Sequence, residues 1–149
     1  MKKIGINGLG RIGRLVLRQF ISNPSNDIDI VAANDLTPID DLAYLLRFDS
    51  VHGKSTYDIS YGSDFIQLGS KKIKIINEKD PLKLPWKKLG VDIVLECTGL
   101  FRRKEDAAKH ITAGASKVII SAPSESADLT IVQGVNEDSY NPKIHYIFF

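Results

Sequence analysis

A glycine-rich hexapeptide near the N-terminus constrains the fold of this chain more than any other feature. The segment Gly8–Gly13 reads Gly-Leu-Gly-Arg-Ile-Gly and follows a short apolar segment, Lys3–Asn7. After it, apolar residues recur at helical spacing to about Ser22. A lone G-x-G-x-x-G sequence is weak, but between a strand and a helix it is typical of a dinucleotide-binding unit.

Each glycine of the hexapeptide has its own physical reason. Gly8 allows a tight turn after the strand, Gly10 leaves room for a pyrophosphate, and Gly13 lets the helix pack close to the sheet. A helix that begins here presents free N–H groups and the positive end of its dipole, so we expect the amides of Arg11 and Ile12 to donate to phosphates. The alternative is that the glycines only form a tight turn.

An acidic residue after the second predicted strand argues against that alternative. The strand at 29–34 ends on Asn34, and Asp35 follows it, 22 residues beyond Gly13. This is near the spacing of about 20 residues expected for the carboxylate that accepts both ribose hydroxyls. The same carboxylate would repel the 2′-phosphate of NADP, and no arginine follows closely. The sequence therefore favours NAD.

Short apolar runs alternate with helical stretches along the rest of the chain. This pattern predicts one α/β domain over residues 1–149, a Rossmann doubly wound, mainly parallel sheet with a small antiparallel insertion. The insertion is expected at 56–76, and a short helix or turn at 80–89 with Trp86 packed inward. Further helices are predicted at 39–48, opened by Thr37 or Pro38, and at 104–113, with Gly114 at its C-cap. The remaining strands are predicted at 91–97, 117–121 and 129–134, with a last extended segment at 143–149.

Composition excludes several classes of protein. The chain is 43% hydrophobic and 26% charged with a formal net charge of +2, and its basic residues form no stripe, which makes nucleic acid an improbable partner. No stretch reaches the roughly 20 apolar residues of a membrane span, and the N-terminus does not resemble a signal peptide. One cysteine permits no intrachain disulfide and is compatible with a reducing compartment. We therefore expect a cytoplasmic protein.

The thiol and the imidazoles give no sign of catalysis. A nucleophilic cysteine needs a base, and no motif ties His52, His110 or His145 to Cys97, so we interpret Cys97 as a small buried hydrophobe at a strand end. The histidines have no metal-ligand spacing, which predicts no metal site. We expect His52 and His110 on the surface or on a helix face.

Two polar segments follow neighbouring predicted strands. Glu96–Gly99 ends one strand and Ser121–Pro123 ends the next. Ligands of open α/β sheets bind at the carboxyl ends of strands, so both segments are candidates for the cleft. Ordinary loop formation is an equally good explanation of either segment.

Six blocks together resemble glyceraldehyde-3-phosphate dehydrogenase. They appear in that family's order over residues 1 to about 147 and are far more specific than the glycine loop alone. The blocks are Lys3-Ile-Gly-Ile-Asn-Gly-Leu-Gly-Arg-Ile-Gly-Arg14, Ala33-Asn-Asp-Leu36, Leu45-Leu-Arg-Phe-Asp-Ser-Val-His-Gly53, Glu96-Cys-Thr-Gly-Leu-Phe101, Ile120-Ser-Ala-Pro-Ser124 and Gly134-Val-Asn136.

The resemblance implies an NAD-dependent oxidoreductase of glycolysis that forms a homotetramer. Such an enzyme converts glyceraldehyde 3-phosphate, phosphate and NAD to 1,3-bisphosphoglycerate and NADH. The resemblance also assigns cofactor contacts from the adenosine-pyrophosphate end to the nicotinamide. In that order they are Asn7, Arg11 and Ile12; Asn34 and Asp35 at the adenine ribose; Lys79 near the adenine; and Thr98, Gly99, Phe101 and Ser121 toward the nicotinamide.

The C-terminus departs from the family pattern. The family's nucleophilic cysteine lies in a Ser-Asn-Ala-Ser-Cys block, which should begin where this chain ends on Phe148-Phe149. No residue of the chain takes a catalytic role in this comparison. We therefore expect a truncated domain that binds NAD without turnover, and contact with the aldehyde only in a full-length enzyme. The alternatives are the NAD domain of an erythrose-4-phosphate dehydrogenase and a non-catalytic module that binds NAD or RNA.

Overall fold

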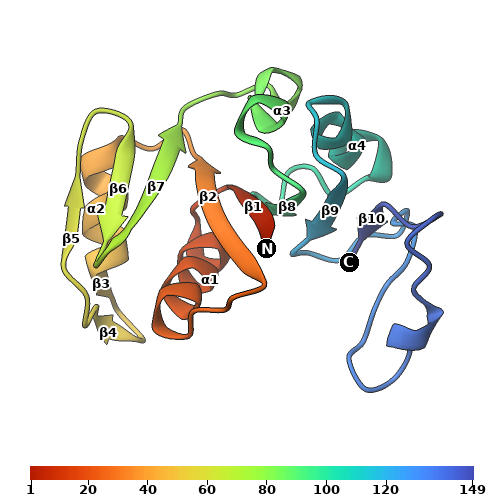
Figure 1. The fold of residues 1–149 in the computed structure, drawn as a ribbon, viewed down its shortest axis with the longest axis horizontal. Helices are drawn as coiled ribbons and strands as arrows, with labels where there is room; N and C mark the ends of the chain where they lie inside the picture. Colours follow the sequence, from red (N-terminus) through yellow and green to blue (C-terminus); the bar gives the residue numbers. More distant parts are fainter.

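A computed structural model describes residues 1–149 and shows an eight-stranded sheet with helices on both faces (Figure 1). Six neighbouring strands are parallel, and two antiparallel strands extend one edge, as the sequence predicts. In spatial order they are β10 (Ile147–Phe148), β9 (Lys117–Ile120), β8 (Ile93–Glu96), β1 (Lys2–Asn7), β2 (Ile28–Asn34), β7 (Lys71–Ile76), β6 (Phe65–Leu68) and β5 (Ile59–Tyr61).

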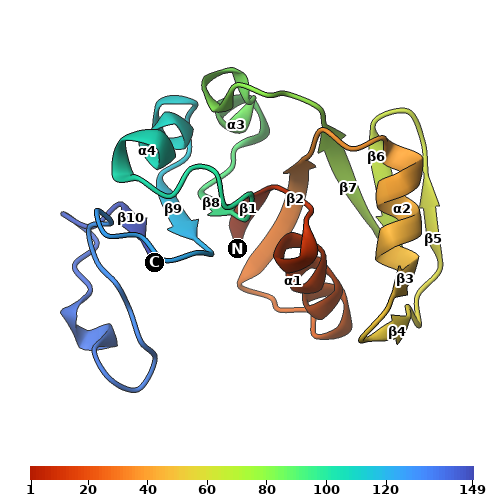
Figure 2. The same cartoon turned by 180° about the vertical axis from the view of Figure 1, so that it is seen from behind.

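Four helices cover the sheet. The helices α1 (Arg11–Ser22) and α2 (Ile39–Arg47) lie on the near face in Figure 2. The short α3 (Trp86–Leu89) and α4 (Lys104–Thr112) pack with a separate apolar cluster that includes Val94 and Val118. The hairpin of β3 (Phe48–Asp49) and β4 (Gly53–Lys54) follows α2, and two 3₁₀ turns lie at η1 (Pro81–Lys83) and η2 (Glu137–Ser139).

The predicted helical spacing places the core side chains. Leu17 of α1 and Leu42 and Leu46 of α2 are at most 1% exposed, and they pack on the sheet in one cluster. Ile12 is 48% exposed although it shares the apolar spacing of α1. Trp86 is fully buried, as expected.

Several predicted bounds are longer than the observed elements. The helix at 39–48 ends at Arg47 because Phe48 is extended and begins β3. The strand at 91–97 narrows to β8, and the helix at 104–113 ends at Thr112, with Ala113 at its C-cap. Gly114 lies one residue after the C-cap, with a φ of 112° that a glycine adopts without strain.

The predicted strand at 129–134 is wrong, and the extended segment at 143–149 shrinks to β10. Only Leu129 forms a bridge, with Phe148. The Asn136 side chain explains the loss, because it accepts a bond from the Val132 N–H at 2.7 Å and donates to the Thr130 carbonyl at 2.9 Å. Side-chain bonds of this kind replace the strand partners that backbone groups would otherwise need.

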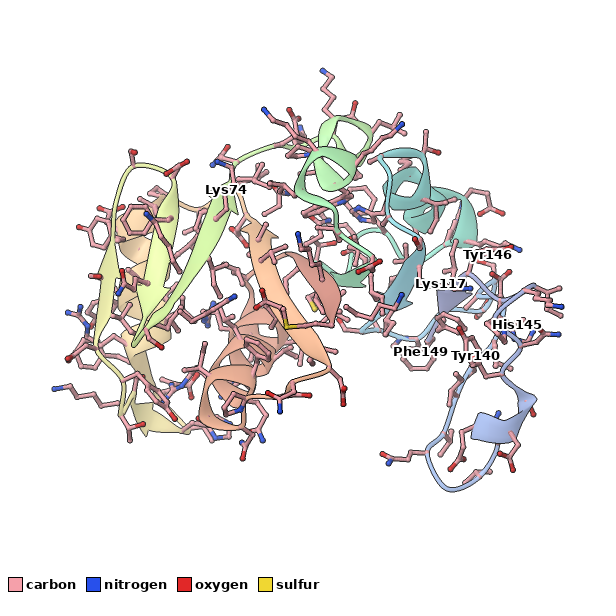
Figure 3. The ribbon with its side chains drawn as sticks, viewed as in Figure 1. Lys74, Lys117, Tyr140, His145, Tyr146 and Phe149 are labelled. Atoms are coloured by element: carbon pink, nitrogen blue, oxygen red, sulfur yellow. The ribbon has the colours of Figure 1, made fainter.

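The C-terminal stretch folds around one lysine. Lys117 of β9 points among the side chains of Tyr140, His145 and Tyr146 (Figure 3). Its Nζ donates to the His145 carbonyl at 2.6 Å and lies 4.3 Å from the centre of the Tyr146 ring. These contacts tie the irregular segment after β9 to the edge of the sheet.

Candidate functional site: a cleft at the carboxyl ends of three strands

Three neighbouring strands end at one level and form the floor of a cleft. The register pairs Asn7 at the end of β1 with Asn34 of β2 on one side and with Glu96 of β8 on the other. The chain leaves β1 toward β2 and later reaches β8 on the opposite side, so this is a topological switch point, where open α/β sheets bind ligands. The cleft has a volume of about 800 Å³. Its lining comes from four segments and one residue of α4: Asn7, Gly8 and Gly10; Asn34, Asp35 and Leu36; Glu78, Lys79, Asp80, Pro81 and Lys83; Cys97, Thr98, Leu100 and Phe101; and Lys109.

The glycine loop has the geometry that the motif predicts. Gly8 has a φ of 94°, and a Cβ placed on it would lie 2.8 Å from the Thr98 nitrogen. A Cβ on Gly13 would lie 2.0 Å from the Gly8 carbonyl oxygen. A Cβ on Gly10 would meet no atom within 4 Å, so the space above this residue is open. Gly8 and Gly13 therefore close the turn, and Gly10 leaves the cleft accessible.

The N-terminus of α1 opens beside this loop. Gly10 is the N-cap and has no side chain with which to cap the helix. The Arg14 N–H donates to the Gly10 carbonyl at 3.1 Å. The N–H groups of Arg11, Ile12 and Gly13 precede this bond and have no acceptor inside the helix. Such an end attracts an anion through its free donors and its dipole.

The carboxylate of Asp35 joins the glycine loop to the turn after β2. Its Oδ2 accepts the Leu9 N–H at 2.6 Å, and its Oδ1 accepts the Thr37 N–H at 2.9 Å. Each carboxylate oxygen has two lone pairs, so both oxygens keep a free acceptor site in the half-buried side chain. Asp35 thus fixes the loop and still offers acceptors to the cleft.

The remaining predicted contacts divide into two groups. Thr98, Phe101 and the exposed Lys79 line the cleft, whereas Ser121 and Gly99, whose φ is 73°, lie outside its lining. Ile12 and Gly13 are also outside it and border it only through the helix end.

The Arg11 side chain points away toward the hairpin after α2. Its guanidinium pairs with Asp49 at 3.3 Å. The N–H groups of His52 and Val51 donate to the Asp49 carboxylate and, with Arg11, lower its pKa to about 2. The role expected for Arg11 therefore rests on its backbone amide.

The cleft also contains three residues that the sequence did not reveal, Glu78, Lys83 and Lys109, which line it. Glu96, which belongs to the predicted segment Glu96–Gly99, is buried and bonds Asn7 of the lining, and His110 is buried beside it. His110 is 0% exposed, so a surface position is wrong, whereas a position on a helix face is confirmed, because His110 lies on the buried face of α4. The inward positions of α4 explain this, because Ala107 and His110 are three residues apart and share its buried face. His52 is exposed, as expected.

Cys97 is buried at the end of β8, as predicted, and burial raises the pKa of its thiol to about 11. The neighbouring charge of Glu96 raises it further, against a hydrogen bond with the Ser121 hydroxyl. No histidine is within hydrogen-bonding distance of Cys97, so it lacks the base that a nucleophile needs.

The donor set of the cleft fits a dinucleotide. Uncapped helix amides lie at the start of α1 beside Gly10, carboxylate acceptors lie at Asp35, and the lysines at 79, 83 and 109 line the cleft. No group of three His, Cys, Asp or Glu side chains is arranged to hold a metal ion. No helix of the structure is long and apolar enough to cross a membrane.

Comparison with known proteins agrees with this geometry. Residues 2–104 match the family described as the NAD binding domain of glyceraldehyde 3-phosphate dehydrogenase. The chain is 52% identical over 145 residues to glyceraldehyde-3-phosphate dehydrogenase of Geobacillus stearothermophilus and 50% identical over 145 residues to that of Chlamydia pneumoniae. The Thermotoga maritima enzyme is 50% identical over 143 residues. These alignments cover 96–97% of the chain but only 43% of each relative.

Proposed function

We propose that residues 1–149 form one domain whose cleft binds NAD, since the chain belongs to the glyceraldehyde-3-phosphate dehydrogenase family and carries its NAD-binding domain. One observation carries the proposal. The open N-terminus of α1 and the Asp35 carboxylate border the same cleft, and the 2.6 Å bond from the Leu9 N–H holds them together.

Different residues of the cleft contact different parts of the cofactor. The loop Gly8–Gly13 binds the pyrophosphate, with the amides of Arg11 and Ile12 as donors. Asp35 accepts the ribose hydroxyls, beside Asn34, and Lys79 lies at the adenine. Thr98, Gly99, Phe101 and Ser121 border the nicotinamide end. NAD supplies a hydride acceptor when bound, and these residues bind and orient it.

The activity proposed for the whole protein is the phosphorylating oxidation of glyceraldehyde 3-phosphate by a homotetramer in the cytoplasm. Residues 1–149 alone are proposed to bind the cofactor without turnover. The state of Cys97 supports this, because a thiol with a pKa of about 11 and no histidine partner is a poor nucleophile at neutral pH.

Titration calorimetry with NAD and NADP tests the binding proposal. We expect the chain to bind NAD more tightly than NADP. Asp35→Ala should weaken NAD binding by about tenfold or more, because it removes a charge-assisted acceptor. The same variant should narrow the difference between the two cofactors, since the charge that repels the 2′-phosphate is gone.

Asp64→Ala is the matched control. Asp64 is exposed in the turn before β6 and pairs with Lys74, outside the cleft. We expect it to leave both affinities unchanged. A folded chain that binds no NAD at millimolar concentration would disprove the proposal, as would an Asp35→Ala variant with unaltered affinity.

A further inference from the structure

Five buried side chains form a continuous hydrogen-bonded series that begins at Asn34 and Asn7 in the lining of the cleft. Trp86, His110, Glu96, Asn7 and Asn34 are each at most 5% exposed. The Trp86 Nε1 lies 3.0 Å from the His110 Nδ1, and the His110 Nε2 lies 2.9 Å from the Glu96 Oε2. The Asn7 amide donates to the same Glu96 oxygen at 2.7 Å, and the Asn34 amide donates to the Asn7 Oδ1 at 2.8 Å. The series therefore links α3, α4, β8, β1 and β2.

The main chain sets the direction of the series at one end. The Glu78 N–H donates to the Asn34 Oδ1 at 2.9 Å, and the Glu78 carbonyl accepts from the Asn34 Nδ2 at 2.9 Å. Backbone groups cannot exchange these roles, so the Asn34 amide has one allowed orientation. Asn7 must then present its oxygen to Asn34 and its NH₂ group to Glu96.

The indole sets the direction at the other end. An indole N–H only donates, so the His110 Nδ1 is an acceptor. The imidazole is therefore neutral, and its proton is on Nε2, from which it is donated to Glu96. On the other Glu96 oxygen, the Thr98 N–H donates at 2.8 Å, together with the Thr98 hydroxyl. The amide of Asn7, the Nε2–H of His110 and the N–H of Thr98 can only donate, an arrangement that favours the ionised form of Glu96.

Glu96 contacts both walls of the cleft through these bonds. Its Oε2 holds Asn7, which directly precedes Gly8 of the glycine loop. Its Oε1 holds Thr98, whose hydroxyl accepts the Leu100 N–H at 3.0 Å. The two walls touch, because Gly8 leaves no room for a Cβ beside the Thr98 nitrogen. The position of Glu96 therefore sets the spacing between the glycine loop and the segment Thr98–Leu100.

We propose that Glu96 is a positioning residue for the cofactor. Its buried negative charge gathers the donors of Asn7 and Thr98 and holds the two walls of the cleft at the separation that a bound dinucleotide requires. His110 and Trp86 hold Glu96 in place in turn. This inference rests on the proposed NAD site. It adds to that site a residue that affects binding without contacting the ligand.

An isosteric substitution tests the charge separately from the packing. Glu96→Gln keeps the shape but places an NH₂ group against donors. We expect NAD affinity measured by calorimetry to fall by about tenfold or more. Asn7→Asp should also weaken binding, because two carboxylates then face each other at the 2.7 Å contact. Glu105→Gln, an exposed residue of α4, is the matched control and should bind as the wild type does.

The double variant Asn7→Asp with Glu96→Gln should restore NAD binding. A role of these residues in packing alone would not predict this recovery. The double variant moves the carboxylate to residue 7 and the amide to residue 96, so Thr98 still meets an oxygen. The His110 Nε2 lies 3.5 Å from the residue 7 side chain and can donate there. We expect the double variant to recover most of the affinity that each single variant loses. Unchanged binding in Glu96→Gln, or no recovery in the double variant, overturns the proposal.

Nitrogen NMR of His110 in the wild-type chain gives a measurement that needs no variant to fold. We expect an unprotonated Nδ1, a protonated Nε2 and a hydrogen-bonded indole N–H of Trp86 at neutral pH. A proton on Nδ1 overturns the proposal even if NAD binds. A wild-type chain that shows the expected tautomer but does not bind NAD would instead refute the proposed function. In that case a urea-unfolding cycle on the same four proteins decides whether residues 7 and 96 are coupled as inferred.

Discussion

Two hollows of similar size lie on this domain, and they differ in what forms their walls. The cleft of about 800 Å³ has 4 hydrophobic residues among its 16, whereas a groove of about 910 Å³ beside α1 has 10 among its 15. The groove is lined by the faces of strands, including Ile93, Leu95 and Ile119, and by the side of α1 that carries Val16 and Phe20. The cleft is lined where strands end and a helix begins.

The difference shows that volume and apolar character do not identify a cofactor site in this fold. Side chains cover the face of a sheet, so the groove offers apolar contact and few fixed donors. Strand and helix ends expose main-chain groups that the fold itself orients, so the cleft offers directed donors and acceptors. We therefore expect changes at the cleft to affect NAD binding, and changes at the groove to leave it intact.

The largest expected effect is a difference in stability between variants of two glycines of the loop. Gly13→Ala should destabilise the domain by about 3 kcal/mol, because its Cβ would lie 2.0 Å from the Gly8 oxygen. Gly10→Ala should cost less than about 1 kcal/mol of stability, because its Cβ meets open space. It should nevertheless lower NAD affinity, since the methyl group enters the space for the pyrophosphate. Urea unfolding and calorimetry on both variants check this, and equal stability losses would contradict it.

The next prediction concerns the thiol that lines the cleft. Burial raises the Cys97 pKa from 9.0 to about 11, so its thiolate fraction at pH 8 is about 100-fold lower than for an ordinary thiol. Alkylation by iodoacetamide should be slower than in the urea-unfolded chain by a similar factor. Its rate should rise tenfold per pH unit up to about pH 11. Equal rates in the folded and unfolded chain would show that the cleft exposes this residue.

A smaller effect lies near the groove, where Asp49 holds Arg11 of α1. The Asp49 pKa falls from 3.8 to about 2 on folding, so its contribution to stability is complete only above about pH 5. That contribution is lost as the pH falls from about 5 through 2. Asp49→Asn should therefore be less stable than the wild type at pH 6 and should lose less stability on acidification. Urea midpoints from pH 6 to pH 2.5 measure this, and parallel curves would contradict it.

The smallest expected effect is on cofactor binding when the groove is changed. Ile119 is 40% exposed on β9, so Ile119→Lys should fold normally and reduce the binding of a hydrophobic dye. NAD affinity should change by less than about twofold, since Ile119 lines the groove and not the cleft. A large loss of NAD binding would remove the distinction between the two hollows.

Whether a part of the structure could be predicted from the sequence depends on how far apart in the chain its contacting residues lie. The glycine loop and Asp35 could be predicted because their spacing along the chain reflects one strand–helix–strand unit, β1–α1–β2. The burial of His110 could not, because its partners Trp86, Glu96 and Asn7 come from three other elements whose alignment depends on sheet register. The false strand at 129–134 has the opposite cause. Its β-branched residues suit a strand, but the nearby Asn136 side chain bonds the Thr130 carbonyl and the Val132 N–H in place of strand partners.

The pairing of Asn7 with Glu96 also has a consequence for biosynthesis. The two residues are 89 positions apart in the chain but adjacent in the sheet. As the polypeptide leaves the ribosome, the glycine loop emerges long before the strand that completes its floor. Until β8 has been synthesised and has closed that long-range contact, the nascent chain has the phosphate-binding sequence without the wall that Thr98 provides. Cofactor capture is therefore expected only after β8 has been synthesised and has paired with β1.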